Sequence, residues 1–275
     1  MIIGISLINY TGDNSIYRNK LAVMLESLFN SDIMDYPFIF SIFDNGNSTV
    51  GNAHTRGLIH DHHAKLDLST QEVLFNSSPS PLGMITSRNF TFYRIMAENH
   101  EIDYILELHN DMIFPKKWFK PLVDFMENNK DYGIISPTIV TSRLTPFTKV
   151  TDATFDCKRL DKPTKIVANH PDLIRVSCLE TTGFYLEVLK EQNWEETELW
   201  YRFNRAGFKV GILPDSVVYH EKMGTRKLLE KAFIEKYGTT RINFHIILEL
   251  YGNDFLKYLG EFIKEDEYIQ KHVER

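Results

Sequence analysis

The sequence predicts an α/β fold, with a mostly parallel central sheet and helices on both of its faces. Across the first 140 residues, apolar β-branched runs alternate with segments whose apolar residues recur at helical spacing. The predicted strands lack a polar face, which is typical of parallel strands buried under helices. The chain has 275 residues, of which 43% are hydrophobic, so it can bury a complete core.

Each predicted element follows from a local pattern. "IIGISLINY" is a continuous apolar run, and the helix after it repeats apolar residues at Leu21, Met24 and Leu28. Pro121 counts against the continuity of the helix in which it lies. In chain order, the predicted elements are the strand 2–10, the helix 18–31, the strand and polar turn 38–51, the helix 87–100, the strand 104–111, the helix 116–129 and the strand 132–140.

The second half of the chain is less regular. Residues 141–180 are rich in Thr, Lys and Asp, and we interpret them as a surface excursion in which a hairpin is one alternative. "HDHHAK", residues 60–65, lacks the spacing of a metal hydrolase motif and is expected in a solvated loop. The last fifty residues are predicted to form an amphipathic helix that packs on the rest of the chain or on a second copy. Its apolar residues are Phe233, Tyr237, Ile242, Phe244, Ile247, Leu248 and Leu250.

Composition excludes several classes of protein. The formal net charge of −6 argues against a general nucleic-acid binder, although a local basic groove stays open. Cys157 and Cys178 allow at most one disulfide, so the chain is no disulfide scaffold and suits a reducing compartment. The N-terminus lacks the pattern of a signal peptide, and no apolar run reaches the roughly 20 residues that span a bilayer. We therefore expect a cytoplasmic protein without a transmembrane segment, peripheral to a membrane only through its partners.

Polar side chains follow three of the predicted strands. They occupy residues 9–13, 44–47 and 109–111. Ligands of open α/β sheets bind beyond the carboxyl ends of the strands, so these three groups are expected to meet at one cleft. Alternation along the third strand puts Glu107, His109 and Asp111 on one face. A carboxylate inside a central strand is costly unless it is paired, and Arg88 is the expected partner of Glu107.

Several spaced segments resemble family 2 of the inverting glycosyltransferases. They are "ISLINY", "LESLFN", "FDNGNST", "GMITSRN", "ILELHND", "GIISP" and "EETELWYRFNRAGFKVGILPDSVVYH". No single segment is specific, but their order and spacing together are. The resemblance implies a GT-A fold over residues 1–224, with a nucleotide-sugar-binding half at 1–140 and an acceptor-binding, catalytic half at 141–224. Residues 225–275 lie outside it, as a C-terminal helical extension.

The resemblance also implies a metal site for Mn²⁺ or Mg²⁺. Asp111 matches the last aspartate of the family's Asp-x-Asp motif, which binds the metal. His109 stands where the first aspartate would be, so this chain offers an imidazole instead of a carboxylate. His220 ends "VVYH", where a histidine of the family can complete the metal or diphosphate site. Hard cations favour carboxylate oxygen, and Mn²⁺ also accepts imidazole.

The same resemblance assigns further residues to the donor and to catalysis. Glu196 falls on the family's catalytic aspartate, the base that takes the acceptor's proton. Glu195 and Glu198 are the next candidates for this base. The structural alternative is that these glutamates are only the solvated acidic start of a helix. Arg226 and Lys227 are additional phosphate-binding candidates. The residues expected to bind the nucleotide sugar are Asn9, Tyr10, Asp44, Asn45, Arg88, Asn110 and Asp111.

These assignments predict transfer of a sugar from a nucleoside-diphosphate sugar, with UDP-sugars as the expected donors, to an acceptor glycan, glycolipid or protein. A homo-oligomer stays open, and no nucleic-acid partner is expected. Two alternatives remain at this stage. The first is a catalytically inactive sugar-nucleotide-binding module, which the altered His109-Asn110-Asp111 motif favours. The second is a nucleotidyltransferase, which usually carries a Gly-rich basic loop after its first strand; "NYTGDNSIYR" lacks that loop.

Overall fold

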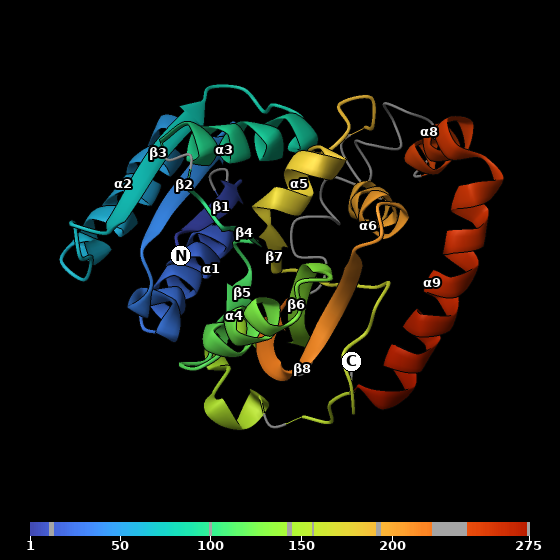
Figure 1. The fold of residues 1–275 in the computed structure, drawn as a ribbon. Coiled ribbons are helices and arrows are strands. Elements are labelled where there is room, and N and C mark those ends of the chain that lie inside the picture. Colours follow the sequence, from blue (N-terminus) through green and yellow to red (C-terminus); the bar gives the residue numbers. More distant parts are fainter. Residues whose placement is uncertain are drawn as a thin grey trace.

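The computed structural model describes residues 1–10, 14–98, 101–141, 145–155, 157–190, 194–221 and 241–273. Within these residues, eight strands form one sheet with helices on both faces (Figure 1). The predicted α/β architecture is confirmed.

The sheet is parallel at one end and mixed at the other. Its strands follow the order β3-β2-β1-β4-β7-β6-β8-β5, in which β3, β2, β1 and β4 are parallel. β7 is antiparallel to both β4 and β6, so β7 begins at the edge where β1, β2 and β4 end. The strands are β1 (Ile3–Asn9), β2 (Phe38–Asn45), β3 (Gln71–Ser78), β4 (Tyr104–Leu108), β5 (Met112–Ile113), β6 (Tyr132–Val140), β7 (Asp172–Arg175) and β8 (Lys209–His220).

Helices follow most of the strands. Pro121 lies in the first turn of α4, where a missing backbone N–H breaks no helical hydrogen bond, and this explains why the helix persists. The helices are α1 (Ser15–Leu28), α2 (Thr49–His63), α3 (Met84–Glu98), α4 (Phe119–Asn128), α5 (Val176–Thr182), α6 (Glu195–Arg205), α8 (Ile242–Tyr251) and α9 (Asn253–His272), with short 3₁₀ segments η1 (Asp32–Asp35), η2 (Phe147–Lys149) and η3 (Asp152–Phe155).

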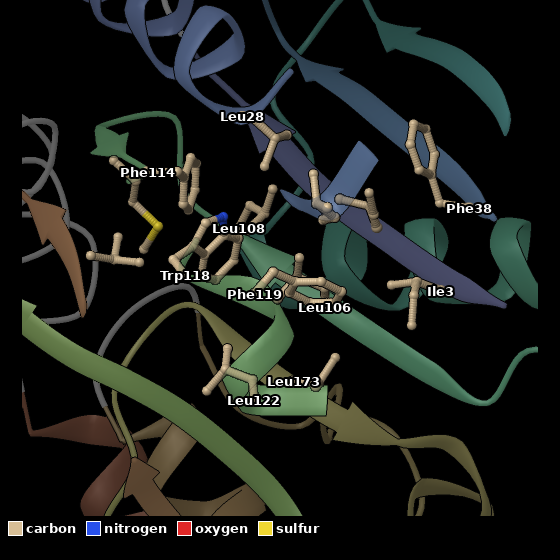
Figure 2. Close-up of a cluster of buried hydrophobic side chains, with 14 of the residues drawn as sticks. Ile3, Leu28, Phe38, Leu106, Leu108, Phe114, Trp118, Phe119, Leu122 and Leu173 are labelled. Carbon is tan, nitrogen blue, oxygen red and sulfur yellow. The ribbon is translucent and has the colours of Figure 1, made fainter. Parts of the chain in front are cut away.

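One hydrophobic core fills the space between the sheet and helices α1 and α4. Leu106 and Leu108 of β4 meet Leu28 of α1 and Phe119 of α4 there, as Figure 2 shows. Trp118 is fully buried in the same cluster, and its indole N–H donates to Ser31 Oγ at 3.1 Å. This hydrogen bond pairs the only polar atom of the Trp118 side chain, so burial of the indole leaves no unpaired donor in the core.

A second core lies on the opposite face, under α3, α5, α6, α8 and α9. It contains Ile105 of β4, Ile174 of β7 and Phe203 of α6, all buried. Since side chains alternate along a strand, Glu107 lies on this second face, between Leu106 and Leu108 of the first. The carboxylate therefore points toward α3 and α6, and this orientation positions the functional site described below.

The C-terminal helices pack on this second face, as predicted. Tyr251 of α8 donates its hydroxyl hydrogen to Glu198 Oε1 at 2.6 Å, and Phe262 of α9 stacks near Trp200 with ring centroids 6.3 Å apart. Figure 1 shows α9 as a long helix along one flank of the molecule. Within residues 241–273, the predicted helix is interrupted at Gly252, whose φ of 56° suits glycine, so α8 and α9 are separate there; the predicted apolar residues Phe233 and Tyr237 lie outside the described residues. The expected domain boundary at 224–225 falls outside the described residues.

The prediction of a solvated loop at residues 60–65 is wrong in its secondary structure, although all of these residues except His62 are exposed as predicted. Residues 60–63 form the last turn of α2, and the His62 ring is buried against Phe29 with centroids 4.9 Å apart. The sequence interpretation also missed α2 and β3 altogether. Polar residues dominate α2, which obscures its helical period; Ser48, however, is a recognisable N-cap, since its hydroxyl accepts from the Gly51 N–H at 3.2 Å.

The irregular region 141–180 contains more structure than predicted. η2, η3, β7 and α5 lie in it, and the hairpin alternative is wrong, because β7 pairs with the distant strands β4 and β6. No disulfide joins Cys157 and Cys178. Among the helices that the structure describes, none combines the length and apolar character needed to cross a membrane.

Candidate active site

The predicted strand ends meet at one edge of the sheet. Asn9 and Asp44 are register partners at the ends of β1 and β2, and Asn110 follows β4 beside them. His220 ends β8 and pairs with Met112, next to Asp111. The residues of the predicted donor and metal sites thus come together, although more than 200 positions separate Asn9 from His220 in the sequence.

A network of neutral polar groups surrounds Asp44. Asn9 Nδ2 donates to Asp44 Oδ1 at 2.6 Å, and Thr55 Oγ1 donates to the same oxygen at 3.2 Å. Asn110 Nδ2 donates to Asn9 Oδ1 at 2.9 Å, which links the end of β4 to this network. Burial raises the pKa of Asp44 above its usual range, and the hydrogen bonds from Asn9 and Thr55 offset part of that effect.

The second carboxylate oxygen of Asp44 has no hydrogen-bond partner among the described residues. Asp44 is fully buried, and Oδ2 is one of the buried side-chain atoms without a hydrogen-bond partner. An unpaired buried acceptor is costly, so Oδ2 suits an N–H donor supplied by a ligand.

Asn45 and Tyr10 lie near this network with different surroundings. Both polar atoms of the Asn45 side chain bond the backbone of Leu82, at 2.9 Å to its carbonyl and 2.7 Å from its N–H. Asn45 therefore fixes the loop before α3. Tyr10 directly follows β1 and is half-buried. The turn after Asn45 needs Gly46, because its φ is 76° and an added Cβ would lie 2.5 Å from Pro81 N.

His109, Asp111 and His220 form a compact group of three potential ligands. One ligand atom from each lies within 4.8 Å of the others. His220 Nε2 is 3.1 Å from Asp111 Oδ1 and 3.4 Å from His109 Nδ1. The Glu221 N–H donates to the Asp111 carbonyl at 3.1 Å, which ties the end of β8 to the loop after β4.

This group fits a divalent transition metal. Burial, together with the neighbouring His170 and His220, holds the pKa of His109 well below its usual range, so its imidazole is neutral and can coordinate. Two imidazole nitrogens and one carboxylate oxygen suit Mn²⁺ better than Mg²⁺, which prefers oxygen ligands throughout. The donor set thus favours the first of the two predicted metals.

Arg88 of α3 is buried among three carboxylates. Its Nε lies 2.6 Å from Glu107 Oε1, its NH2 lies 2.8 Å from Glu196 Oε1, and its NH1 lies 3.6 Å from Glu195 Oε1. The Tyr185 ring covers the guanidinium at 4.9 Å, and the Tyr185 hydroxyl donates to Glu107 Oε2 at 2.7 Å. The predicted pairing of Glu107 with Arg88 is confirmed. Because carboxylates surround it, Arg88 is oriented toward Glu196 instead of standing free for a diphosphate.

Glu195 and Glu196 begin α6, and their environments differ. Glu195 is only 4% exposed, whereas the Glu196 side chain is 28% exposed. Burial and the charge of Glu196 raise the pKa of Glu195 to about 7. Burial alone would also raise the pKa of Glu196, but His170 and Arg88 outweigh it and hold that pKa well below its usual range. Glu196 is therefore an ionised, partly accessible carboxylate.

His170 is a member of this site that sequence reasoning missed. Its Nε2 lies 2.8 Å from Glu196 Oε1, and its ring lies over that of His109 with centroids 4.3 Å apart. Burial would lower the pKa of His170, but the carboxylates of Glu196 and Asp172 raise it to about 9. His170 comes just before β7, and an antiparallel strand brings its beginning, not its end, to this edge of the sheet.

Two further sequence predictions concern residues elsewhere. Arg226 and Lys227, the additional phosphate candidates, lie outside the described residues. Glu198, the third acidic residue of α6, is fully buried, and Arg202 binds it through Nε at 2.7 Å and NH2 at 3.0 Å. The Arg202 NH1 also donates to the Thr182 and Gly183 carbonyls. Glu198 is thereby committed to holding Arg202 in the protein interior.

Comparison with known proteins adds information on the fold. No protein-family model and no curated protein sequence matches the chain. The solved structure of S. aureus TarS superposes with a TM-score of 0.61 at 13% identity, covering 91% of this chain and 39% of that one. A structure of TarS 1-349 in complex with UDP-GlcNAc gives 0.57 at 14% identity, covering 81% and 59%. GalNAc-T7 with UDP, GalNAc and Mn²⁺ gives 0.58 at 14% identity, covering 80% and 44%.

The chain spans less than two thirds of the length of each of these solved chains. At such low identity the likeness concerns the fold. TarS and GalNAc-T7 share the curled sheet flanked by helices that is described above. The chain therefore has the GT-A fold found in glycosyltransferases.

Proposed function

We propose that the protein is an inverting glycosyltransferase of the family 2 type. It transfers a sugar from a nucleoside-diphosphate sugar, with UDP-sugars as the expected donors, to a hydroxyl group of a glycan, glycolipid or protein acceptor. The GT-A fold and the solved neighbours that contain UDP or UDP-GlcNAc support this proposal.

The nucleotide binds on the side of the site formed by β1, β2 and β4. Asp44 Oδ2 is a buried acceptor without a partner among the described residues, and it suits the N–H of a pyrimidine base. Hydrogen bonds link Asn110 to Asp44 through Asn9. They connect the base-binding residue to the loop that carries Asp111. With the base at Asp44, the diphosphate of the donor would lie beside His109, Asp111 and His220.

These three residues would hold the divalent metal. When bound, the metal neutralises the diphosphate and stabilises it as a leaving group. The protein contributes a neutral His109 and fixes the other two ligands through the pairing of β5 with β8. The ligands are thus oriented before the donor arrives, which limits the reorganisation that binding requires.

Glu196 acts as the base. It takes the proton from the acceptor hydroxyl while the hydroxyl oxygen attacks the anomeric carbon and the bond from that carbon to the diphosphate oxygen breaks. Glu196 is ionised and more exposed than Glu195, so an acceptor can reach it. Glu195 is buried, its pKa is raised to about 7, and its Oε1 lies 3.6 Å from Arg88 NH1, so it contacts Arg88 and not the acceptor.

One observation carries the proposal. His109 belongs to the metal-ligand group with Asp111 and His220, and also to a second group with His170 and Glu196. Donor phosphate and acceptor hydroxyl would therefore meet on the two sides of a single imidazole. Inverting transfer requires this adjacency, because base and leaving group act on the same carbon at the same time.

Donor turnover tests the proposal. The protein is incubated with a panel of sugar nucleotides and Mn²⁺ or Mg²⁺, and release of nucleoside diphosphate is measured. We expect turnover with at least one UDP-sugar, faster with Mn²⁺, and loss of it in Glu196→Gln. Binding without turnover, with acceptors present, would instead favour the inactive binding module. The two cation contacts to Glu196 Oε1 are the observation that favours this second candidate, since they already neutralise the base.

A further inference from the structure

Two buried carboxylates lie side by side in the sheet beneath the site. Glu107 of β4 and Asp172 of β7 are register partners in the antiparallel pair, and they are 2% and 0% exposed. Like charges directly opposite each other destabilise a sheet unless each is compensated. Both belong to the second face, which α3 and α6 cover.

Each of these carboxylates is next to a cationic side chain that also contacts Glu196. Glu107 binds Arg88 at 2.6 Å, and Asp172 Oδ2 lies 3.9 Å from His170 Nδ1. Arg88 NH2 and His170 Nε2 each lie 2.8 Å from the same oxygen, Glu196 Oε1. The paired strands thus supply two carboxylates, and the cation beside each of them, Arg88 of α3 or His170 before β7, contacts the same oxygen of Glu196.

Asp172 is itself fixed by other side chains. Ser136 of β6 donates its hydroxyl hydrogen to Asp172 Oδ1 at 2.5 Å, and Trp200 of α6 donates its indole N–H to Oδ2 at 3.4 Å. The ring nitrogens of His170 do not meet the geometry of a hydrogen bond to described residues, so the His170 contacts depend on charge and distance. Asp172 therefore acts on His170 by electrostatic attraction from a fixed carboxylate, and not by a hydrogen bond.

We propose that His170, held by Asp172, is a positioning residue for the base Glu196. Arg88 and His170 together fix Oε1 of Glu196, so the carboxylate is held with its second oxygen directed away from both cations. Both contacts are made to Oε1, and no ion pair to Oε2 is found among the described residues, which leaves that oxygen for the acceptor proton. With Arg88 as its single partner, the Glu196 carboxylate could rotate about the Arg88 contact. A base misplaced by about 1 Å loses about 100-fold in rate.

This inference depends on the proposed function and extends it to a residue that the family resemblance does not include. His170 could instead be a metal ligand, since it lies in a potential ligand group with His109 and Glu196. The guanidinium of Arg88, 3.5 Å from His109 Nε2, argues against that, because a second cation at that distance would repel a metal there. The positioning role and the ligand role predict different metal affinities.

The experiment compares His170→Leu, His170→Gln and the wild-type protein. We expect His170→Leu to lower kcat about 10- to 100-fold while the donor KM and the Mn²⁺ affinity, measured by calorimetry, stay unchanged. His170→Gln keeps an N–H donor near the position of Nε2 and should recover part of the rate. His245→Gln, on the exposed face of α8, is the matched control and should change nothing. Thermal unfolding verifies that each variant is folded.

Crystal structures of the wild type and of His170→Leu give a readout that does not need activity. We expect the Glu196 carboxylate to leave the position it shares with Arg88 when His170 is removed. An unmoved carboxylate, an unchanged kcat in folded His170→Leu, or a drop in Mn²⁺ affinity would each overturn the positioning role. Absence of transfer by the wild type would instead reject the proposed function, and the crystal structures would still decide the position of Glu196.

Discussion

Asp44 and Glu196 are carboxylates at the same edge of one sheet, and their surroundings shift their pKa values in opposite directions. Asp44 has neutral partners, the amide of Asn9 and the hydroxyl of Thr55, and burial raises its pKa. Glu196 has cationic partners, and its pKa is lowered although burial acts in the other direction. Burial acts in the same direction on both groups, so the nature of the partner decides the direction in which each pKa moves.

This contrast separates two sides of the site. The nucleotide side, around Asp44, is built from neutral hydrogen bonds, which suit recognition of an uncharged base. The transfer side, around Glu196, is built from compensated charges, which suit a proton transfer. Four substitutions test whether the two sides are as different as the contacts suggest.

The largest effect is expected for Glu196→Gln. The amide cannot take the acceptor proton, and general-base catalysis is typically worth about 10² to 10⁴ in rate. Donor affinity should stay nearly unchanged, because Glu196 lies on the transfer side. The measurement is kcat with donor binding by calorimetry. Glu195→Gln is the matched control; if it loses more activity than Glu196→Gln, the two roles must be exchanged.

The next effect is on stability and arises at Asp172. Burial raises the pKa of Asp172 from 3.8 to about 6, so the folded state binds more protons than the unfolded state between these values. The free energy of unfolding should therefore fall as pH rises from about 4 to 6, by on the order of 3 kcal/mol from this group. Asp172→Asn should remove that part of the slope.

Urea unfolding at a series of pH values, with chelator present, measures this difference. The exposed Asp254 of α9 provides the control, and Asp254→Asn should keep the wild-type slope. Identical slopes in wild type and Asp172→Asn would show that Asp172 has an ordinary environment.

A smaller effect is expected for Asp111→Asn. The substitution removes the one carboxylate of the ligand group, so Mn²⁺ affinity and donor affinity should fall about 10- to 100-fold. Excess Mn²⁺ should restore donor binding in part, whereas it should not restore the lost kcat of Glu196→Gln. Calorimetric titration with Mn²⁺ and donor separates the two variants. Normal donor binding by Asp111→Asn without metal would remove the metal from the proposed mechanism.

The smallest effect is expected for Asp44→Asn. A hydrogen bond from a ligand to a charged acceptor is worth about 1.5 kcal/mol at its lower end, or about 10-fold in donor affinity. kcat at saturating donor should be unchanged, because the transfer side is intact. Thr55→Ser keeps the hydroxyl bonded to Asp44 and serves as the control. A loss of kcat in Asp44→Asn would mean that the two sides are coupled and not independent.

The sequence predicted the nucleotide side better than the transfer side. Strands β1, β2 and β4 are continuous apolar runs with polar ends. Parallel strands bring such ends together, so the sequence predicted that Asn9, Asp44 and Asp111 lie at one edge of the sheet. Glu107 required a partner on physical grounds, and Arg88 is that partner.

His170 escaped prediction for a physical reason. The rule that directs attention to the carboxyl ends of strands holds for parallel strands, whereas β7 runs the other way and contributes the residue before its start. β7 is also only four residues long, too short for its alternation to stand out within 141–180. "NHPDL" does place two titratable residues at a strand entry, and that signal could have found the pair.

The packing of α8 and α9 has a consequence for the order of events during synthesis. Glu265 of α9 accepts hydrogen bonds from the backbone N–H groups of residues 165–167 at 2.7 to 2.9 Å, just before His170, and Tyr251 of α8 completes the partners of Glu198. Residues 165–167 and Glu198 are synthesised well before α8 and α9. The transfer side therefore cannot reach its final hydrogen bonding while it emerges, whereas β1 to β4 can assemble first. A nascent chain should acquire nucleotide affinity at a shorter length than it acquires transfer activity.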